Sequence, residues 1–231
     1  MHTVLVTGAN RGLGLELARQ YAHDGWQVLA CCREPEQAEK LRRIADASEG
    51  RVRTFRLDVT SAAQIQSLAR ELQDQPIDIF VNNAGIYGPR PAPLGRVREE
   101  DWIEVFRINS IAPLKLAEAF VEHVARSRQK IFATISSVMG SMEENREGGD
   151  YIYRSSKAAA NAVVKSLSLD LRNRNITVVA LHPGWVRTDM GGEQAPLNVE
   201  ESVAGMRTVL VSLTLKKTGK FFGFDGAEIP W

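Results

Sequence analysis

Short apolar runs alternate with longer amphipathic segments from the first residues of the chain onward. Each short run is five or six residues long and mostly aliphatic, a pattern typical of a buried strand. The runs are Thr3–Thr7, Gln27–Cys32, Val52–Leu57, Ile77–Val81, Lys130–Ile135 and Thr177–Leu181. Strands alternating with helices predict an α/β fold, with right-handed crossovers and helices on both faces of a parallel sheet.

The segments between these runs have the spacing of amphipathic helices. Ile65, Leu68, Ala69 and Leu72 follow the i, i+3, i+4, i+7 rule. The run from residue 102 to residue 124 predicts one long helix. Because the chain has no internal repeat, low-complexity tract or linker, we expect a single domain over residues 1–231.

Composition and charge narrow the class of protein. The 231 residues are 44% hydrophobic and 25% charged, with a net charge of +1, as in an ordinary globular protein without a nucleic-acid or membrane surface. No apolar stretch approaches the length of a membrane helix, and the N-terminus lacks a signal peptide's basic start.

Cys31 and Cys32 are adjacent and should point to opposite faces of a strand, so we expect reduced thiols and a cytoplasmic protein. The four histidines form no cluster with metal-ligand spacing, so no metal is predicted.

A glycine-rich turn follows the first predicted strand and precedes a helix. Its spacing is Gly-x-x-x-Gly-x-Gly, from Gly8 to Gly14. Glycines let the backbone approach a phosphate closely, and the helix N-terminus offers free N–H groups to an anion. The turn predicts a dinucleotide site that contains Thr7, Gly8, Asn10, Arg11, Gly12, Leu13 and Gly14.

The end of the second predicted strand indicates which dinucleotide is bound. An acidic residue at this place holds the ribose 2′-hydroxyl of NAD, whereas arginine accommodates the 2′-phosphate of NADP. Here Cys32 stands where the carboxylate would be, and Arg33 follows. With Arg11 as a second cation, this favours NADP(H), while NAD(H) remains possible. The alternative is that Arg33 is a surface charge and Glu34 binds the ribose.

Two further segments follow predicted strands and fit the same site. Asp58 and Val59 come after the third strand, where a carboxylate can accept a hydrogen bond from the adenine amino group. Asn83, Ala84 and Gly85 come after the fourth, where small and amide side chains let the backbone pass close to a cofactor.

Tyr153 and Lys157 are four residues apart at the start of a predicted helix, so they share one face. A cation near a phenol favours the phenolate, which makes tyrosine usable as an acid or base. Tyr151 has Ser155 four residues on and lacks this partner, so it is excluded as the acid and is expected at the pocket or its rim.

Asn109 lies inside the predicted long helix, four residues before Pro113. Proline has no N–H group, so it cannot bond the carbonyl of Asn109, and the helix should kink there. The open carbonyl is a candidate acceptor for a bound water; a tolerated kink without catalytic value is the alternative.

Together these motifs resemble the short-chain dehydrogenase/reductase family over most of the chain, from Thr7 to Thr188. The segments 153–159, 182–192 and 224–231 are most similar to its C-factor/sniffer-type carbonyl reductase branch. The resemblance implies one doubly wound Rossmann-type domain with a mostly or wholly parallel seven-stranded sheet. It divides that domain into a cofactor half of about residues 1–95 and a catalytic and substrate half of about residues 96–231.

The resemblance also assigns roles. It implies that Tyr153 donates the proton, that Lys157 tunes it and holds the nicotinamide ribose, and that Ser137 polarises the substrate carbonyl. Ser137 lies 16 residues before Tyr153 in this chain, three more than is typical of the family, and the extra length falls in residues 141–150. A water on the backbone of Asn109 would pass protons toward Lys157.

The resemblance further implies which residues bind the two ligands. The cofactor would be bound by Pro183, Gly184, Val186 and Thr188. The substrate would be bound by Ser137, Tyr151, Tyr153 and Trp185; for Trp185 the alternative is burial in the core.

The resulting prediction is an NADPH-dependent reductase of a ketone, aldehyde or quinone. One alternative is an NAD(P)-dependent alcohol or hydroxysteroid dehydrogenase that works in the oxidative direction with the same residues. The other is a C-factor-like signalling or binding protein in which turnover is incidental. The expected partners are a small carbonyl substrate and further copies of the chain, in a homodimer or homotetramer.

Overall fold

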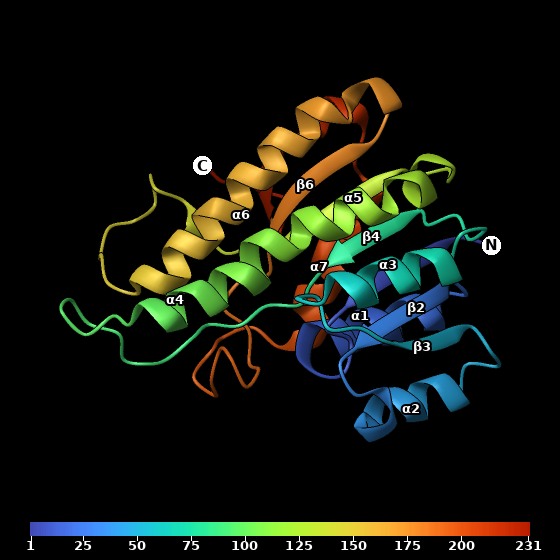
Figure 1. Cartoon of the computed structure of the whole chain (residues 1–231), viewed down its shortest axis with the longest axis horizontal. Helices are drawn as coiled ribbons and strands as arrows, with labels where there is room; N and C mark the ends of the chain where they lie inside the picture. Colours follow the sequence, from blue (N-terminus) through green and yellow to red (C-terminus); the bar gives the residue numbers. More distant parts are fainter.

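Seven parallel strands form one sheet in the order β3-β2-β1-β4-β5-β6-β7 (Figure 1). The computed structural model describes all 231 residues. The strands are β1 (Thr3–Thr7), β2 (Gln27–Cys32), β3 (Val52–Arg56), β4 (Ile79–Asn82), β5 (Ile131–Ile135), β6 (Thr177–His182) and β7 (Lys220–Gly223). The predicted α/β class and wholly parallel sheet are confirmed. The pattern missed β7, because four residues are too few to show a periodicity.

Helices cover both faces of the sheet, and each face has its own hydrophobic core. On one face lie α1 (Gly12–His23), α2 (Glu39–Asp46) and α7 (Val199–Val211). On the other lie α3 (Ala62–Glu71), α4 (Glu99–Phe106), α5 (Ala112–Ala125) and α6 (Tyr151–Asp170), which are in front in Figure 1. Neighbouring strand residues alternate between the two cores, so Cys32 packs with α1 and Cys31 with α3. The two thiols therefore face apart, as predicted, and both are free.

The predicted long helix is wrong in one respect, because a π-helical segment, Arg107–Ile111, separates α4 from α5. The N–H of Ala112 bonds the carbonyl of Arg107, five residues back. The next bond in that register would join Pro113 to Ile108 and cannot form, since proline has no N–H. The chain then resumes α-helical geometry in α5, which places Pro113 in the first turn, where proline is tolerated.

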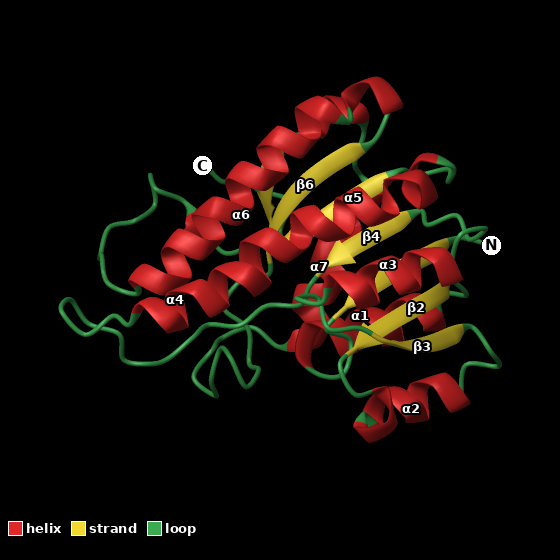
Figure 2. Ribbon diagram, in the orientation of Figure 1, coloured by secondary structure: helices red, strands yellow, loops and turns green.

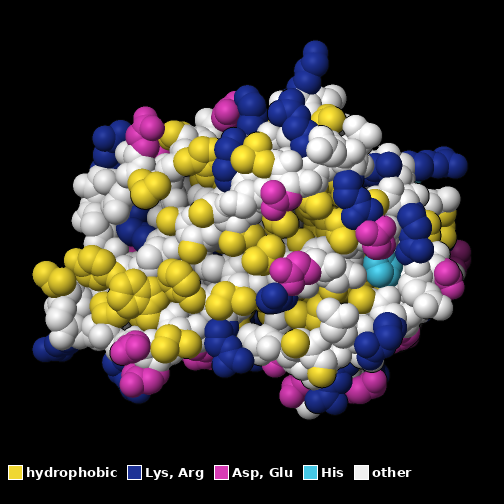
Figure 3. All heavy atoms as spheres, turned by 45° about the horizontal axis from the view of Figure 1, so that its top comes forward, with side chains coloured by type: hydrophobic (Ala, Val, Ile, Leu, Met, Phe, Trp, Pro, Cys, Tyr) yellow, Lys and Arg dark blue, Asp and Glu magenta, His cyan; other side chains and the backbone are white.

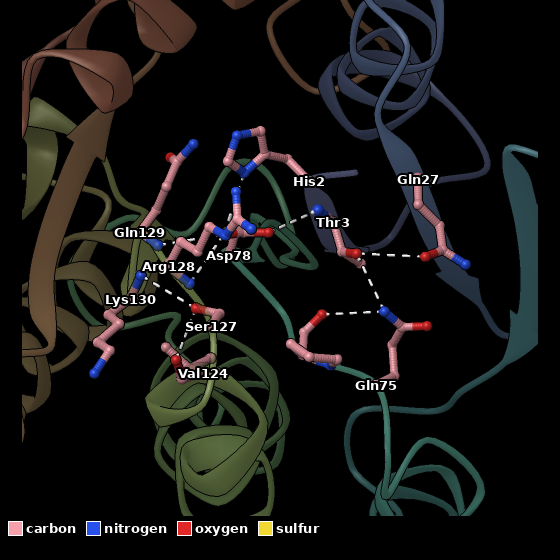
Figure 4. Close-up of polar contacts among 11 residues, drawn as sticks. His2, Thr3, Gln27, Gln75, Asp78, Val124, Ser127, Arg128, Gln129 and Lys130 are labelled. Atoms are coloured by element: carbon pink, nitrogen blue, oxygen red, sulfur yellow. Dashed lines mark hydrogen bonds and ion pairs between the residues drawn. The ribbon is translucent and has the colours of Figure 1, made fainter.

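Asp78 ties together the amino ends of three strands (Figure 4). Its buried carboxylate accepts hydrogen bonds from the backbone N–H of Thr3 at 2.9 Å and from those of Arg128 and Gln129 at 3.2 Å each. The ring of His2 approaches the same carboxylate, with 3.3 Å between Nδ1 and Oδ1. This cluster therefore lies at the amino ends of the central strands, on the side of the sheet away from the carboxyl ends.

The carboxyl ends of the strands point toward the longest loops of the molecule (Figure 2). These loops are residues 83–98, 141–150 and 183–198. In open parallel sheets, ligands bind outside the carboxyl ends of the strands, so this edge is where a site is expected. No helix is long and apolar enough to cross a membrane.

Candidate active site

A cavity of about 720 Å³ opens at the carboxyl edge of the sheet. It runs from the glycine turn, past the ends of β2, β3 and β4, to the start of α6. The residues predicted from the sequence that line it are Gly8, Asn10, Arg11, Gly12, Leu13, Arg33, Asp58, Val59, Asn83, Ala84, Gly85, Tyr153, Lys157, Pro183 and Thr188. Residues far apart in the sequence are thus brought to one surface.

The glycine turn has the backbone geometry that an anion site needs. Gly8 adopts a φ of +67°, which side chains rarely tolerate. A Cβ on Gly14 would lie 2.3 Å from the carbonyl oxygen of Gly8, so only glycine fits. Unlike α3 and α7, which Ser61 and Asn198 cap, α1 has no capping side chain. Its first N–H groups therefore remain available to a phosphate, in line with a pyrophosphate at this turn.

Thr7 and Asn83 support the turn from behind. The hydroxyl of Thr7 is buried and accepts hydrogen bonds from the N–H groups of Asn83 and Ala84, both at 3.0 Å. The Asn83 amide donates to the carbonyls of Thr7 at 2.8 Å and Gly8 at 3.2 Å. These bonds join the ends of β1 and β4. Thr7 thus does not line the cavity, although it shapes the cavity floor.

Two cations, Arg33 and Lys40, lie on the cavity wall near Cys32. Arg33 is exposed there, and Lys40, in the first turn of α2, lines the same wall. Sequence reasoning missed Lys40, because a lysine on an exposed helix carries no spacing signal. Asp58 faces the cavity with one carboxylate oxygen already bonded to the N–H and hydroxyl of Thr60, at 2.9 and 2.8 Å. The N–H of Thr60, with a smaller effect from Arg33, lowers the pKa of Asp58.

Arg11 lines the cavity and is paired with a residue from another loop. Its guanidinium forms an ion pair with Asp189 in the loop after β6. Both side chains are mostly exposed, so the pair contributes about 0–1 kcal/mol. The same loop is held internally, since Thr188 accepts a hydrogen bond from the N–H of Gly191 at 3.0 Å.

Tyr153 and Lys157 lie side by side on α6 and are nearly buried. The Lys157 ammonium is 5.7 Å from the centre of the Tyr153 ring and donates a hydrogen bond to the carbonyl of Ile135 at 2.8 Å. Burial raises the pKa of Tyr153 to about 12, although a hydrogen bond with Ser137 partly offsets it. Burial lowers the pKa of Lys157 to about 8. At neutral pH the phenol therefore keeps its proton, and the amine remains mostly charged.

The two serines after β5 make different contacts. The hydroxyl of Ser137 accepts from the N–H of Met139 at 3.2 Å and lies beside Tyr153. The hydroxyl of Ser136 donates to the side chain of Asn161 at 2.6 Å. Of the pair, Ser137 is thus the one that meets the phenol, whereas Ser136 is the one that lines the cavity.

Asn109 is buried where the π-helical segment meets α6. Its side chain accepts from the N–H of Ile86 at 2.9 Å and donates to the carbonyl of Ile86 at 2.8 Å. It also donates to the hydroxyl of Ser156 at 3.0 Å. The side chain thereby fixes the loop after β4 against α6, a role that the sequence analysis did not include.

The remaining predicted residues lie outside the cavity lining. Gly184 packs against Leu197 and Phe224, and Val186 is buried in a short bridge to Leu197. Tyr151 is 38% exposed at the first position of α6. Trp185 is 57% exposed, and its indole N–H bonds the carbonyl of Gly191 at 2.7 Å, so the alternative of core burial is wrong.

Apolar side chains gather on the surface at the end of the molecule where these loops lie, on the left in Figure 3. Leu94, Met142 and Tyr151, which come from the loops and the start of α6, are among the exposed large apolar residues. An apolar surface of this kind is better suited to an apolar organic substrate than to a highly charged one.

Comparison with known proteins agrees with this geometry. The sequence model of the short chain dehydrogenase family matches residues 2–198. The chain is 41% identical to the C-signal protein of Myxococcus xanthus over 167 residues, which cover 72% of the chain and all of that protein. It superposes on the carbonyl reductase Sniffer of D. melanogaster with a TM-score of 0.93, at 33% identity and over the whole of both chains. An NADPH-bound carbonyl reductase from chicken fatty liver gives a TM-score of 0.93 at 34% identity, over 100% of this chain and 99% of that one.

Proposed function

The chain belongs to the short-chain dehydrogenase/reductase family of oxidoreductases, in its C-factor/sniffer-type branch, and from that premise we propose that it is an NADPH-dependent carbonyl reductase. The observation that carries the proposal is the buried Tyr153–Lys157 pair on the wall of a cavity that begins at an uncapped glycine turn. The proposed substrate is a ketone, aldehyde or quinone, which becomes an alcohol.

The residues present fit a bound NADP(H). The free N–H groups at the start of α1 would hold the pyrophosphate, and the cations Arg33 and Lys40 would hold the 2′-phosphate. Lys157, with its ammonium directed toward the end of β5, would hold the nicotinamide ribose. When bound, the nicotinamide supplies the hydride that the carbonyl carbon receives.

The chain's own residues supply the proton. Because burial raises the pKa of Tyr153 to about 12, the phenol carries its proton at neutral pH and can give it to the substrate oxygen. The hydroxyl of Ser137, beside this phenol, would stabilise the negative charge that develops on the same oxygen. Lys157 would stabilise the phenolate, and a water on the Asn109 carbonyl would return a proton toward it.

Replacing the proposed proton donor tests the mechanism. We expect Tyr153→Phe to lower kcat/KM for carbonyl reduction by about 10²- to 10⁴-fold, the usual contribution of general acid catalysis. The assay follows NADPH oxidation with small diketones, quinones and aldehydes. The affinity for NADPH, measured by calorimetry, should hardly change.

Tyr151→Phe is the matched control, since it removes the same hydroxyl two residues away. It should keep kcat within a few-fold of wild type. Equal turnover by wild type and Tyr153→Phe would contradict the assignment and favour a binding protein with incidental turnover.

Arg33 and Lys40 test the cofactor preference. Each replacement by glutamine should raise the Kd for NADPH by roughly 10- to 100-fold, the worth of a charge-assisted hydrogen bond, and leave the Kd for NADH nearly unchanged. Glu34→Gln distinguishes a 2′-phosphate site at Arg33 from a ribose site at Glu34. If that change weakens NADH and NADPH alike while Arg33→Gln affects neither, Glu34 binds the ribose and the preference for NADP(H) is wrong.

A further inference from the structure

The aromatic ring of Tyr87 covers one face of the Tyr153 ring. Tyr87 lies in the loop after β4, and the two ring centres are 4.1 Å apart with the planes inclined by only 14°. The guanidinium carbon of Arg90 lies 3.2 Å from the centre of the Tyr87 ring. Since Tyr153 already occupies one face of Tyr87, Arg90 must cover the other. The three side chains thus form a stack in the order Arg90, Tyr87, Tyr153.

Contacts at both ends hold this stack in place. The hydroxyl of Tyr87 is 3.7 Å from the sulfur of Met139, next to Ser137. Arg90 donates a hydrogen bond to the carbonyl of Met190 at 3.2 Å, which joins the loop after β4 to the loop after β6. Between them, Gly88 passes so close to Val105 that a Cβ on it would lie only 2.9 Å from that side chain. The stack is therefore tied to α4 and to two loops of the site.

The charges in the stack bear directly on proton transfer. Two parallel tyrosine rings place their electron-rich faces near each other, so a negative charge on Tyr153 would weaken the stack. A cation on the outer face of Tyr87 opposes that effect. In agreement, Tyr87 raises the pKa of Tyr153 and Arg90 lowers it, both by less than burial does.

The other charged groups around the stack come from α6 and from Asp150, the residue before it. Lys157 is 5.7 Å from the Tyr153 ring centre. Asp150 and Arg154 act on Tyr87, on whose pKa their effects oppose each other. Arg90 is thus the cation that lies against Tyr87, whereas Lys157 lies farther away, over the Tyr153 ring.

We propose that Tyr87 and Arg90 are positioning residues for the proton donor: Tyr87 fixes the plane of the Tyr153 ring, and Arg90 offsets the negative charge left on Tyr153. In that step the O–H bond of Tyr153 breaks, its electron pair stays on the phenolic oxygen, and the proton forms a new O–H bond with the substrate oxygen. This inference rests on the proposed function.

Variants of Tyr87 separate the ring from its hydroxyl. Tyr87→Leu should lower kcat about 2- to 10-fold, the worth of one aromatic stack, with a smaller change in KM. Tyr87→Phe keeps the ring and should restore kcat. Near-ultraviolet circular dichroism of the cofactor-free protein should change in Tyr87→Leu only, because it reports the stacked rings rather than turnover.

Arg90→Gln tests the charge. The oxidation of the alcohol product needs the phenolate, so its rate rises with pH through the pKa of Tyr153. Loss of Arg90 should therefore shift the rising part of the pH–rate profile to higher pH by about half a unit. Arg154→Gln is the matched control, because it removes an arginine from the same rim but not from the stack, and its profile should stay at the wild-type position.

The outcomes distinguish this inference from the proposed function. If wild type is active and Tyr153→Phe is not, yet Tyr87→Leu keeps full kcat, or the pH profiles of Arg90→Gln and Arg154→Gln coincide, only this inference fails. If Tyr87→Leu does not fold, the Arg90→Gln profile decides alone. If wild type reduces no carbonyl compound, the proposed function fails and this inference falls with it.

Discussion

Ser136 and Ser137 are neighbours with the same side chain, yet their surroundings give them different uses. Consecutive residues at the end of a strand point to opposite sides, and here one hydroxyl meets Asn161 and the other Tyr153. That alternation is predictable from the sequence. Which serine faces the phenol is not, because it depends on how β5 is placed against α6; family resemblance supplied that choice.

Lys157 shows how a residue proposed for function can lower stability. Burial lowers its pKa from 10.5 to about 8, which corresponds to about 3 kcal/mol at neutral pH. Between pH 8 and 10.5 the unfolded chain binds this proton more strongly than the folded one, so the stability of wild type should rise with pH across that window.

Lys157→Met should therefore be more stable than wild type at pH 7, by about 2 kcal/mol after the lost hydrogen bond to Ile135 is allowed for. The difference should shrink as the pH rises from 8 to 10.5. Urea unfolding at several pH values measures it. A variant that is less stable at pH 7, or a difference that is independent of pH, would show that the buried ammonium carries no such cost.

At the scale of elements, the π-helical segment is the part of the fold that the hydrophobic pattern could not predict. A single wide turn shifts the buried face of a helix by about one residue, and in a long, mostly apolar run so small a shift does not stand out in the i, i+3, i+4 spacing. The missing N–H of Pro113 did indicate a disturbance, but as a kink rather than a change of register. The contacts of Asn109 with Ile86 and Ser156 depend on that register, which is why sequence alone did not reveal them.

Pro113→Ala tests whether the disturbance matters to catalysis. In the α-helical register that the chain resumes in α5, an alanine N–H at this position would bond the carbonyl of Asn109, four residues back, and the proposed water would lose its acceptor. We expect kcat to fall roughly 10-fold, because proton return is impaired. Since Pro113 lies in the first turn of α5, the free energy of unfolding should change by under about 1 kcal/mol.

Pro76→Ala, at the other edge of the sheet, is the control and should leave kcat unaltered. An unchanged kcat in Pro113→Ala would mean that the proline is merely tolerated there.

At the scale of the whole molecule, the determinants of folding and of the proposed chemistry occupy opposite edges of one sheet. The Asp78 cluster joins the amino ends of the strands (Figure 4), and the cavity lies at their carboxyl ends. The periodicity of the chain predicted the layers, and the order of its motifs predicted which segments meet at the cavity. The sequence did not reveal the role of Asp78, because a single acidic residue before a strand cannot be told from an ordinary surface charge.

Asp78→Ala should lower stability without lowering activity. It would leave the N–H groups of Thr3, Arg128 and Gln129 without their acceptor, at a cost of about 2–4 kcal/mol. Thermal and urea unfolding measure the loss, and kcat should be unchanged at a temperature where the variant is folded. Glu118→Ala, which removes an exposed partner of Lys115, should cost under about 1 kcal/mol.

The separation of the two edges has an evolutionary consequence. None of the three loops around the cavity, residues 83–98, 141–150 and 183–198, contributes more than a few buried side chains, and none belongs to either hydrophobic core. Of the three, residues 141–150 hold none of the residues proposed for the cofactor or the proton donor, so insertions and deletions there should be nearly neutral for folding. The longer spacing between Ser137 and Tyr153 is one such change. A lineage with this scaffold can acquire a new substrate by altering the length of this loop while it inherits the sheet, the glycine turn and the proposed proton donor intact.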